Sequence, residues 1–257
     1  MGNNSRAAKE NPVKHFTKRA PLYNRSSSWV DDSVLIRTIS GLAQAGPGSR
    51  VLDIAIGTGR IAREFKGSGS RVVGVDICPA MARKARACAD TIVLTPAEKL
   101  PFKNDSFDLC VCRQGLQFMD LGKVVSEIRR VLKPGGRVVL CHVTAYGMID
   151  KKETFFIQKL RNPARKNFFL PGDFVSVLKE KRFASVESFE YITEESVRRW
   201  INNGAIGEEE KSKIMAAYRS ASEAFKRIHN VKFRAGGDII DSMMMVIVRA
   251  RKREKGA

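Results

Sequence analysis

The chain of 257 residues has no apolar run long enough to cross a lipid bilayer. Its start, Met1 to Asn11, is polar and contains no hydrophobic segment, which argues against a signal peptide. Internal repeats and low-complexity segments are also missing. These absences argue against membrane-spanning and secreted classes, so we expect a globular protein of the cytoplasm.

Cysteine and histidine are scarce, with five and three residues. All cysteines except Cys88 fall in or beside apolar segments typical of strands, which indicates small buried side chains in a reducing compartment rather than disulfides. Cys110 and Cys112 would share one face of a strand, but a single pair at this spacing does not predict a metal site. We therefore expect no bound metal ion.

Acidic residues are also few, because 27 Asp and Glu stand against 46 Lys and Arg, for a formal net charge of +19. This excess attracts anions, so an anionic substrate, nucleic acid or an acidic carrier protein would be a suitable partner. A generally basic surface is the simpler interpretation. Basic residues gather in segments 6–25 and 151–166, and a third run, Arg249 to Lys255, is predicted to be a solvated tail.

Apolar strands alternate with amphipathic helices along the chain, which predicts an α/β fold with a parallel sheet covered on both faces. We expect strands at 50–54, 71–75, 91–94, 107–112, 137–143, 184–192 and 243–248. We expect helices at 32–42, 60–65, 79–89, 121–133 and 172–182. In a later helical stretch, five residues at helical spacing predict a stripe that faces the core or, alternatively, lines a substrate pocket: Ile214, Tyr218, Ala221, Phe225 and Ile228.

The most specific pattern is residues 51–62, where a buried strand runs into a glycine turn and then a helix. Backbone N–H groups of such a turn point at a ligand, and Gly57 to Ala62 satisfies the G-x-G-x-x-G/A pattern of dinucleotide sites. Asp53 would face a pyrophosphate with the wrong sign of charge, so it favours a cationic ligand group instead. The next strand ends at Asp76, a carboxylate that suits a nucleoside.

Further motifs agree with a cationic ligand. Residues 97–102 have the sequence A-E-K-L-P-F, and residues 132–136 have the sequence L-K-P-G-G. Together with D-x-x-x-G-x-G at 53–59 and the acidic Asp76, they resemble the class I S-adenosylmethionine-dependent methyltransferases, especially the ubiquinone/menaquinone C-methyltransferase branch. The resemblance covers residues 15–145. It implies S-adenosyl-L-methionine as cofactor, S-adenosyl-L-homocysteine as product, and a Rossmann-like seven-stranded sheet, mostly parallel with an antiparallel last strand.

The resemblance also implies roles for single residues. Asp76 would accept hydrogen bonds from the ribose hydroxyls, Ile77 would lie against the adenine face, and the carbonyl of Arg113 would hold the ammonium group. Tyr23 would close over the cofactor as a lid or, alternatively, pack the first helix. The full set of expected cofactor-binding residues is Tyr23, Asp53, Ala55, Gly57, Gly59, Asp76, Ile77, Met81, Ala97, Glu98 and Arg113.

Some positions depart from the family pattern. Ala55 replaces the first glycine of the commoner G-x-G-x-G loop, a change that also occurs in the quinone-methylating branch. Pro96 stands where an aspartate usually reaches the adenine amino group, so a water molecule or Glu98 would replace that contact. Residues 113–118 carry neither the D/N-P-P-Y motif of enzymes that methylate amino groups of bases nor a Pro-Cys nucleophile.

Methyl transfer from a sulfonium depends mainly on positioning and desolvation, so a general base is optional. His142, His15 and Gln117 are the candidate catalytic residues. Each has a simpler interpretation: His142 would be packed within a strand, His15 would be exposed in a basic segment, and Gln117 would be exposed at a helix start.

We therefore expect methyl transfer to a small-molecule acceptor, such as a phenolic, quinone-like or other biosynthetic intermediate. RNA or an acidic carrier protein is the alternative acceptor, and a cofactor-binding protein without catalysis is the remaining hypothesis. In this interpretation residues 1–45 form a helical cap segment, and 46–192 with 241–257 form the cofactor-binding domain. The helical insertion 193–240 would cover the substrate.

Overall fold

The computed structural model describes residues 11–254, so the polar start of the chain and its last three residues lie outside the described part. The strands are β1 (Arg50–Ile54), β2 (Arg71–Asp76), β3 (Thr91–Leu94), β4 (Phe107–Arg113), β5 (Leu132–Val143), β6 (Phe183–Ser196), β7 (Lys232–Phe233) and β8 (Ile239–Lys252). The helices are α1 (Pro12–Arg19), α2 (Ser28–Asp31), α3 (Ser33–Ala43), α4 (Arg60–Gly67), α5 (Pro79–Ala85), α6 (Leu121–Val131), α7 (Lys151–Arg161), α8 (Asp173–Glu180), α9 (Val197–Ile201), α10 (Glu208–Ser220) and α11 (Glu223–Ile228). Short 3-10 helices are η1 (Tyr23–Arg25), η2 (Leu116–Phe118) and η3 (Ala235–Gly237).

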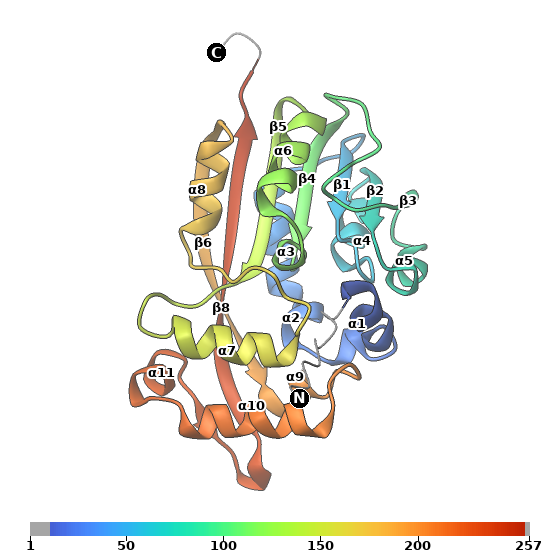
Figure 1. The fold of residues 1–257 in the computed structure, drawn as a ribbon. Helices are drawn as coiled ribbons and strands as arrows, with labels where there is room; N and C mark the ends of the chain where they lie inside the picture. Colours follow the sequence, from blue (N-terminus) through green and yellow to red (C-terminus); the bar gives the residue numbers. More distant parts are fainter. Residues whose placement is uncertain (1–10, 255–257) are drawn as a thin grey trace, which may run out of the picture.

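One mixed sheet runs through the molecule in the order β3-β2-β1-β4-β5-β8-β6, and β7 pairs with β8 at one end (Figure 1). The first five strands are parallel, whereas β8 is antiparallel to both β5 and β6. The main path therefore has seven mostly parallel strands and an antiparallel last strand, which confirms the expected fold. Among the helices of residues 11–254, none has the length and apolarity needed to span a membrane.

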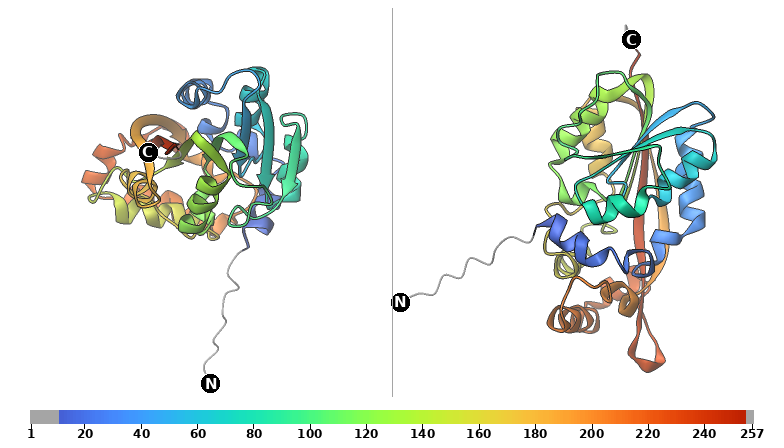
Figure 2. Two further views of the ribbon diagram at one scale, coloured as in Figure 1. Left: turned by 90° about the horizontal axis from the view of Figure 1, so that it is seen from above. Right: turned by 90° about the vertical axis from the view of Figure 1, so that its right-hand side faces the viewer.

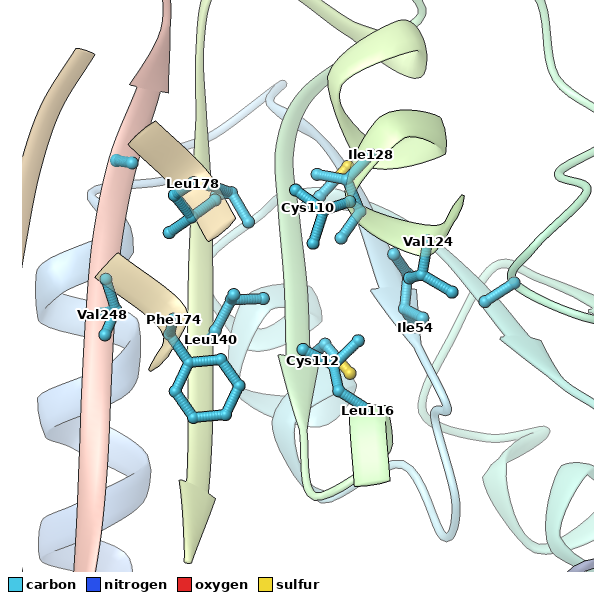
Figure 3. Close-up of a cluster of buried hydrophobic side chains, with 14 of the residues drawn as sticks. Ile54, Cys110, Cys112, Leu116, Val124, Ile128, Leu140, Phe174, Leu178 and Val248 are labelled. Carbon is cyan, nitrogen blue, oxygen red and sulfur yellow. The ribbon is translucent and has the colours of Figure 1, made fainter. Parts of the chain in front are cut away.

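Helices cover both faces of the sheet (Figure 2). The cores place α6 and α8 on one face, and α3 and α4 on the other. Side chains alternate along β4, so Cys110 and Cys112 point toward α6 (Figure 3), while Leu109 and Val111 join the opposite core. All five cysteines are buried and free, which confirms their interpretation as small core residues.

Residues 132–136, the L-K-P-G-G segment, form the start of β5 directly after α6. Asp120 starts α6 by accepting the N–H of Lys123 at 3.1 Å, and the helix ends at Val131. Gly135 has a positive φ of 72°. Residues 133–136 bulge out of the pairing between β4 and β5, because the register shifts there. The helix therefore turns into β5 without a separate loop.

The two antiparallel strands are longer than their apolar residues predict. β6 continues to Ser196, and β8 spans residues 239–252, in both cases beyond the expected ends. They pair with each other along almost their whole length, and this ladder satisfies backbone groups even where the side chains are polar. The prediction of a solvated tail is therefore wrong up to Lys252, because Arg249 lies within β8 and pairs with Glu187 at 2.9 Å.

Helices α1, α2, α7, α9, α10 and α11 lie at the carboxyl edge of the parallel strands, and we call them the helical roof (Figure 1). The expected apolar stripe is divided between α10 and α11, because the first helix ends before Ala221. Ile214, Tyr218, Ala221 and Phe225 are nevertheless buried together with Trp200. This shared burial confirms the core-facing interpretation for these four residues, whereas Ile228, at the end of α11, is only partly buried and lies outside this core.

A buried ionic cluster joins the helical roof to the sheet. His229, at the end of α11, lies 3.0 Å from Asp150 Oδ2 through Nε2 and 2.8 Å from Asp241 Oδ1 through Nδ1. Asp150 precedes α7, Asp241 belongs to β8, and the hydroxyl of Tyr218 in α10 donates to Asp241 at 2.5 Å. Burial alone lowers the pKa of His229, but its hydrogen bonds to the two carboxylates outweigh burial and raise the pKa to about 9.

This cluster predicts how stability depends on pH. Because the pKa of His229 rises from 6.5 to about 9 on folding, its stabilising contribution is complete below pH 6.5 and is lost as the pH rises through 9. We expect His229→Gln to lower the free energy of unfolding by roughly 3–5 kcal/mol at about pH 6, since it breaks a buried charge cluster. Urea unfolding of both proteins across this range should show their difference shrinking toward high pH, and a constant difference would contradict the assignment.

Candidate active site

The loop after β1 has a backbone conformation that few residues adopt. Ala55, Gly57 and Gly59 have positive φ angles of 55°, 57° and 79°. Ala55 stands where the family commonly has glycine, and a non-glycine residue in this conformation costs roughly 1–2 kcal/mol. The hydroxyl of Thr58 donates to Asn24 Oδ1 at 2.8 Å and ties the loop to the segment after α1. The protein itself thus holds the turn in shape.

Asp76, at the end of β2, braces this loop from the other side. Its Oδ2 accepts the N–H of Gly57 at 3.0 Å, and its Oδ1 accepts the N–H of Cys78 at 2.8 Å. Each carboxylate oxygen has a second lone pair, so Asp76 keeps acceptor capacity for a ligand. Burial raises the pKa of Asp76, while the two backbone hydrogen bonds act in the opposite direction.

A cavity of about 270 Å³ opens beside these residues, and we call it the cofactor cavity. Its wall contains all but two of the expected cofactor-binding residues: Tyr23, Ala55, Gly57, Asp76, Ile77, Met81, Ala97, Glu98 and Arg113. Pro96 also lies in the wall, and one oxygen of Glu98 accepts the N–H of Asp120 at 2.9 Å. The side chain of Arg113 donates to the carbonyl of Trp29 at 2.9 Å, which joins the end of β4 to α2.

Two expected residues, Gly59 and Asp53, lie outside this wall. A Cβ atom on Gly59 would come within 2.6 Å of the Cβ of Cys88, so this glycine lets α4 pack closely against the end of α5. Asp53 is buried behind the loop, and its Oδ2 has no hydrogen-bond partner among residues 11–254. Burial raises the pKa of Asp53 to about 7, although the charge of Arg113 acts against this rise. Asp53 therefore stands behind the cavity wall rather than in it, where only its charge could reach a bound ligand.

A smaller cavity of about 40 Å³ adjoins the first one. Phe16, Tyr23, Gln114 and Phe118 line both, and we call these four residues the junction. Three arginines stand in the wall of the smaller cavity, which we call the arginine chamber: Arg19, Arg161 and Arg165. They lie in the two basic segments noted in the sequence, but a run of basic residues does not tell which of them will be buried.

Gln117 and His142 lie together beside the arginine chamber. Gln117, in η2, lines the chamber and is only 5% exposed, so its interpretation as an exposed helix-start residue is wrong. The Nδ1 of His142 lies 3.2 Å from Gln117 Oε1, and its ring stacks on Phe174 with centroids 5.0 Å apart. Burial and then the charge of Arg165 lower the pKa of His142 to about 3. His142 is thus a packed, neutral residue that supports Gln117 from outside the described cavity walls.

His15 and Tyr23 belong to the N-terminal segment of the described chain. His15 is buried, so its interpretation as an exposed residue is wrong, and it stands outside the described walls of both cavities. Burial, and after it the charges of Arg19 and Arg161, lower the pKa of His15 to about 3. Tyr23 lines both cavities and also packs against Trp29, with ring centroids 6.3 Å apart. The lid role of Tyr23 thus remains a prediction that its position supports.

A family model described as a methyltransferase domain matches residues 52–140. An uncharacterized protein of Methanocaldococcus jannaschii is 30% identical over 183 residues, which cover 70% of this chain and 86% of that protein. A demethylmenaquinone methyltransferase of Streptomyces avermitilis is 37% identical over 127 residues, covering 48% of this chain and about half (55%) of that relative. The chain belongs to the class I S-adenosylmethionine-dependent methyltransferases.

A solved structure supports the fold of this methyltransferase. The YcgJ protein of Bacillus subtilis aligns with a TM-score of 0.77 at 24% identity, covering 86% of this chain and 97% of that protein. At this identity the likeness concerns the fold alone.

The enzyme uses S-adenosylmethionine as cofactor, and the cofactor cavity fits it by its own chemistry. Asp76 keeps acceptor capacity, Ile77 is 38% exposed in the wall, and the buried carboxylate of Asp53, whose Oδ2 has no hydrogen-bond partner among residues 11–254, suits a cation.

We expect Asp76→Ala to weaken binding of S-adenosylhomocysteine by about 1–3 kcal/mol, because the ligand loses an acceptor and the loop loses its brace. Isothermal titration measures this change. The matched control is Asp90→Ala, since Asp90 accepts the N–H of Val72 at 2.7 Å near the opposite end of β2. A dissociation constant that stays the same in Asp76→Ala, or that rises equally in the control, would refute this placement.

Because the pKa of Asp53 is raised, we expect cofactor binding to depend on pH. Its pKa near 7 means that the carboxylate ionises between about pH 6 and pH 8, and only the ionised form attracts a sulfonium. The preference for S-adenosylmethionine over S-adenosylhomocysteine, which lacks that positive charge, should therefore rise by up to roughly ten-fold over this interval. Competition titrations at each pH measure the ratio. Asp53→Asn should flatten the curve, and a flat curve in the unaltered protein would count against the role of Asp53.

Proposed function

We propose that the enzyme methylates a small-molecule acceptor whose nucleophilic atom is held at the junction. The observation that carries this proposal is that the cofactor cavity and the arginine chamber share the wall residues Phe16, Tyr23, Gln114 and Phe118. S-adenosylmethionine, when bound, supplies a methyl group on a positively charged sulfur that is already activated for transfer. The chain itself must hold the acceptor and exclude water.

Aromatic rings provide the exclusion of water at the junction. The rings of Phe16 and Phe118 meet edge to face with centroids 5.1 Å apart, and Tyr23 lies 6.4 Å from Phe16. A phenolic or quinone-like acceptor would contact these rings through its own ring face. Orientation of two reactants in such a site can contribute about 7–11 kcal/mol to the barrier reduction, so the rate does not require a general base.

Gln114 is the polar group that best fits the acceptor. Its backbone has a positive φ of 59°, and its side chain is buried with Nε2 lacking a partner among residues 11–254. The side chain of Gln117 donates to the Gln114 carbonyl at 2.8 Å and holds this residue in place. Gln114 thus lines both cavities and carries an unpaired amide donor, whereas His142 and His15 stand behind their walls.

The helical roof supports the proposed division of the chain. Trp200 of α9, within the expected insertion 193–240, lines the arginine chamber, and α7 adds Gln158 and Arg161. We therefore assign substrate covering to α7 and α9, and assign α10 and α11 to packing against them. Residues 46–192 and 241–257 would bind the cofactor, with 1–45 as the cap segment. Five free buried cysteines suit a reducing compartment, so we place the enzyme in the cytoplasm.

Methyl transfer can be tested without knowing the acceptor. The enzyme is incubated with methyl-labelled S-adenosylmethionine and separate small-molecule, RNA and protein fractions of a cell extract. We expect label in the small-molecule fraction, and we expect Gln114→Leu to slow its appearance by roughly 100-fold, as for loss of a buried donor at a reaction centre.

The control for Gln114→Leu is its affinity for S-adenosylhomocysteine, which should stay within about three-fold of the unaltered protein. Label that enters RNA or an acidic protein instead would refute the small-molecule proposal and would explain the net charge of +19 by partner binding.

A further inference from the structure

The arginine chamber concentrates positive charge inside the protein. Arg19, Arg161 and Arg165 are 3%, 7% and 8% exposed, and all three line the same cavity. Among the described residues of its wall, none is Asp or Glu. Taking a cation out of water costs several kcal/mol unless an opposite charge compensates it, and three neighbouring cations also repel one another. The chamber is therefore unfavourable for the protein alone.

Two of these arginines are held by neutral partners. Arg161 donates through Nε to the Trp200 carbonyl and through Nη2 to Ser27 Oγ, both at 3.0 Å, and its guanidinium lies 4.4 Å from the Trp200 ring centroid. Arg165 donates through Nη1 to Gln158 Oε1. These contacts are to neutral groups, so they fix the direction of each guanidinium without neutralising its charge.

The carboxylate of Glu195 attracts Arg161 from outside the chamber wall. Glu195 is already engaged, because it accepts the N–H of Ser28 at 2.7 Å and pairs with Arg199 at 3.2 Å. One shared carboxylate does not neutralise three arginines.

Arg19 is the least satisfied of the three. Its Nε and Nη2 have no hydrogen-bond partner within residues 11–254, and its guanidinium lies over the rings of Phe16 and Tyr23 at 5.4 and 5.0 Å. The low pKa of the neighbouring His15 has burial as its main cause and the charge of Arg19 as its second, which agrees with a positive field in this region. A buried donor without a partner indicates an acceptor that arrives with a ligand.

We propose that the arginine chamber binds an oxyanion, a phosphate or carboxylate group, that the methyl acceptor carries. This inference rests on the proposed function, since it concerns the same acceptor. Guanidinium groups match both oxyanions through paired N–H donors. The chamber volume of about 40 Å³ suits a head group of a few atoms rather than a polymer backbone. The oxyanion is the anchor, and the atom that is methylated lies a short distance away at the junction.

The protein contains its own reporter for this site. Its two tryptophans, Trp29 and Trp200, both line the arginine chamber, so intrinsic tryptophan fluorescence monitors this cavity. Inorganic phosphate, pyrophosphate and acetate are titrated separately into the protein loaded with S-adenosylhomocysteine. We expect a saturable change with a dissociation constant of about 1 mM or tighter for at least one anion. Tighter binding of phosphate or pyrophosphate indicates a phosphorylated acceptor, and tighter binding of acetate indicates a carboxylate.

Arg19→Met is the main variant, because it removes the unpaired charge and keeps the apolar stem. We expect it to raise the dissociation constant for the anion by roughly ten-fold or more, while Arg19→Lys restores part of the affinity. The matched control is Arg251→Met, which removes an exposed arginine near the far end of β8 and should change the constant by less than about two-fold. No saturable change with any anion, or an equal loss in the control, would overturn the proposal.

Thermal unfolding separates a ligand site from a structural role of Arg19. Without added anion, Arg19→Met should unfold at the same temperature as the unaltered protein or higher, since a desolvated charge has been removed. Phosphate should raise the unfolding temperature of the unaltered protein and not that of the variant. A lower unfolding temperature of Arg19→Met, with no effect of phosphate on either protein, would show that Arg19 is only structural.

The outcomes also distinguish this inference from the proposed function. Binding of S-adenosylhomocysteine is measured in the same samples, so loss of anion binding with intact cofactor binding overturns the chamber assignment alone. Transfer of methyl groups to RNA or protein, together with anion binding that depends on Arg19, overturns the small-molecule acceptor and leaves the oxyanion site in place.

Discussion

The carboxylate of Asp76 is the contact on which the cofactor site depends. Through Gly57 it holds the left-handed loop after β1, and through Cys78 it holds the start of α5. Both turns follow parallel strands that are adjacent in the sheet, so a single side chain can reach both. Because hydrogen bonds from the backbone already orient it, Asp76 offers its remaining lone pairs to a ligand without further rearrangement.

The two cavities differ in the charged residues that line them. Among the described residues of the walls, carboxylates occur only on the cofactor side, where Asp76 and Glu98 share the wall with Arg113 and Lys166 and Asp53 lies behind it, whereas the charged residues of the other wall are Arg19, Arg161 and Arg165. A cationic sulfonium and an acceptor with an oxyanion would therefore each be attracted to a different end of the site. Under our proposals, the aromatic junction between them keeps the reacting atoms away from water, because water weakens electrostatic attraction. Under our proposals, this polarity aligns the two reactants.

The helical roof reaches the site because the antiparallel strands extend past the parallel ones. β6 and β8 pair beyond the edge of the sheet, and the buried cluster of Asp150, His229 and Asp241 anchors the start of α7 to that extension. Arg161 at the end of α7 and Trp200 of α9 then enter the arginine chamber. The least family-like part of the chain thus shapes the cavity beside the cofactor.

The sequence alone determined the order of strands and helices and most of the cofactor cavity, from Ala55 and Gly57 to Asp76 and Ala97. These residues follow apolar strands, and the carboxyl ends of parallel strands meet at one edge, so local patterns were sufficient. Only the tertiary structure decided that Gly59 serves helix packing and that Arg19, Arg161 and Arg165 are buried together. Whether a charged side chain is buried depends on elements distant in sequence, here α1, α7 and α9, whose meeting no local pattern of charge records.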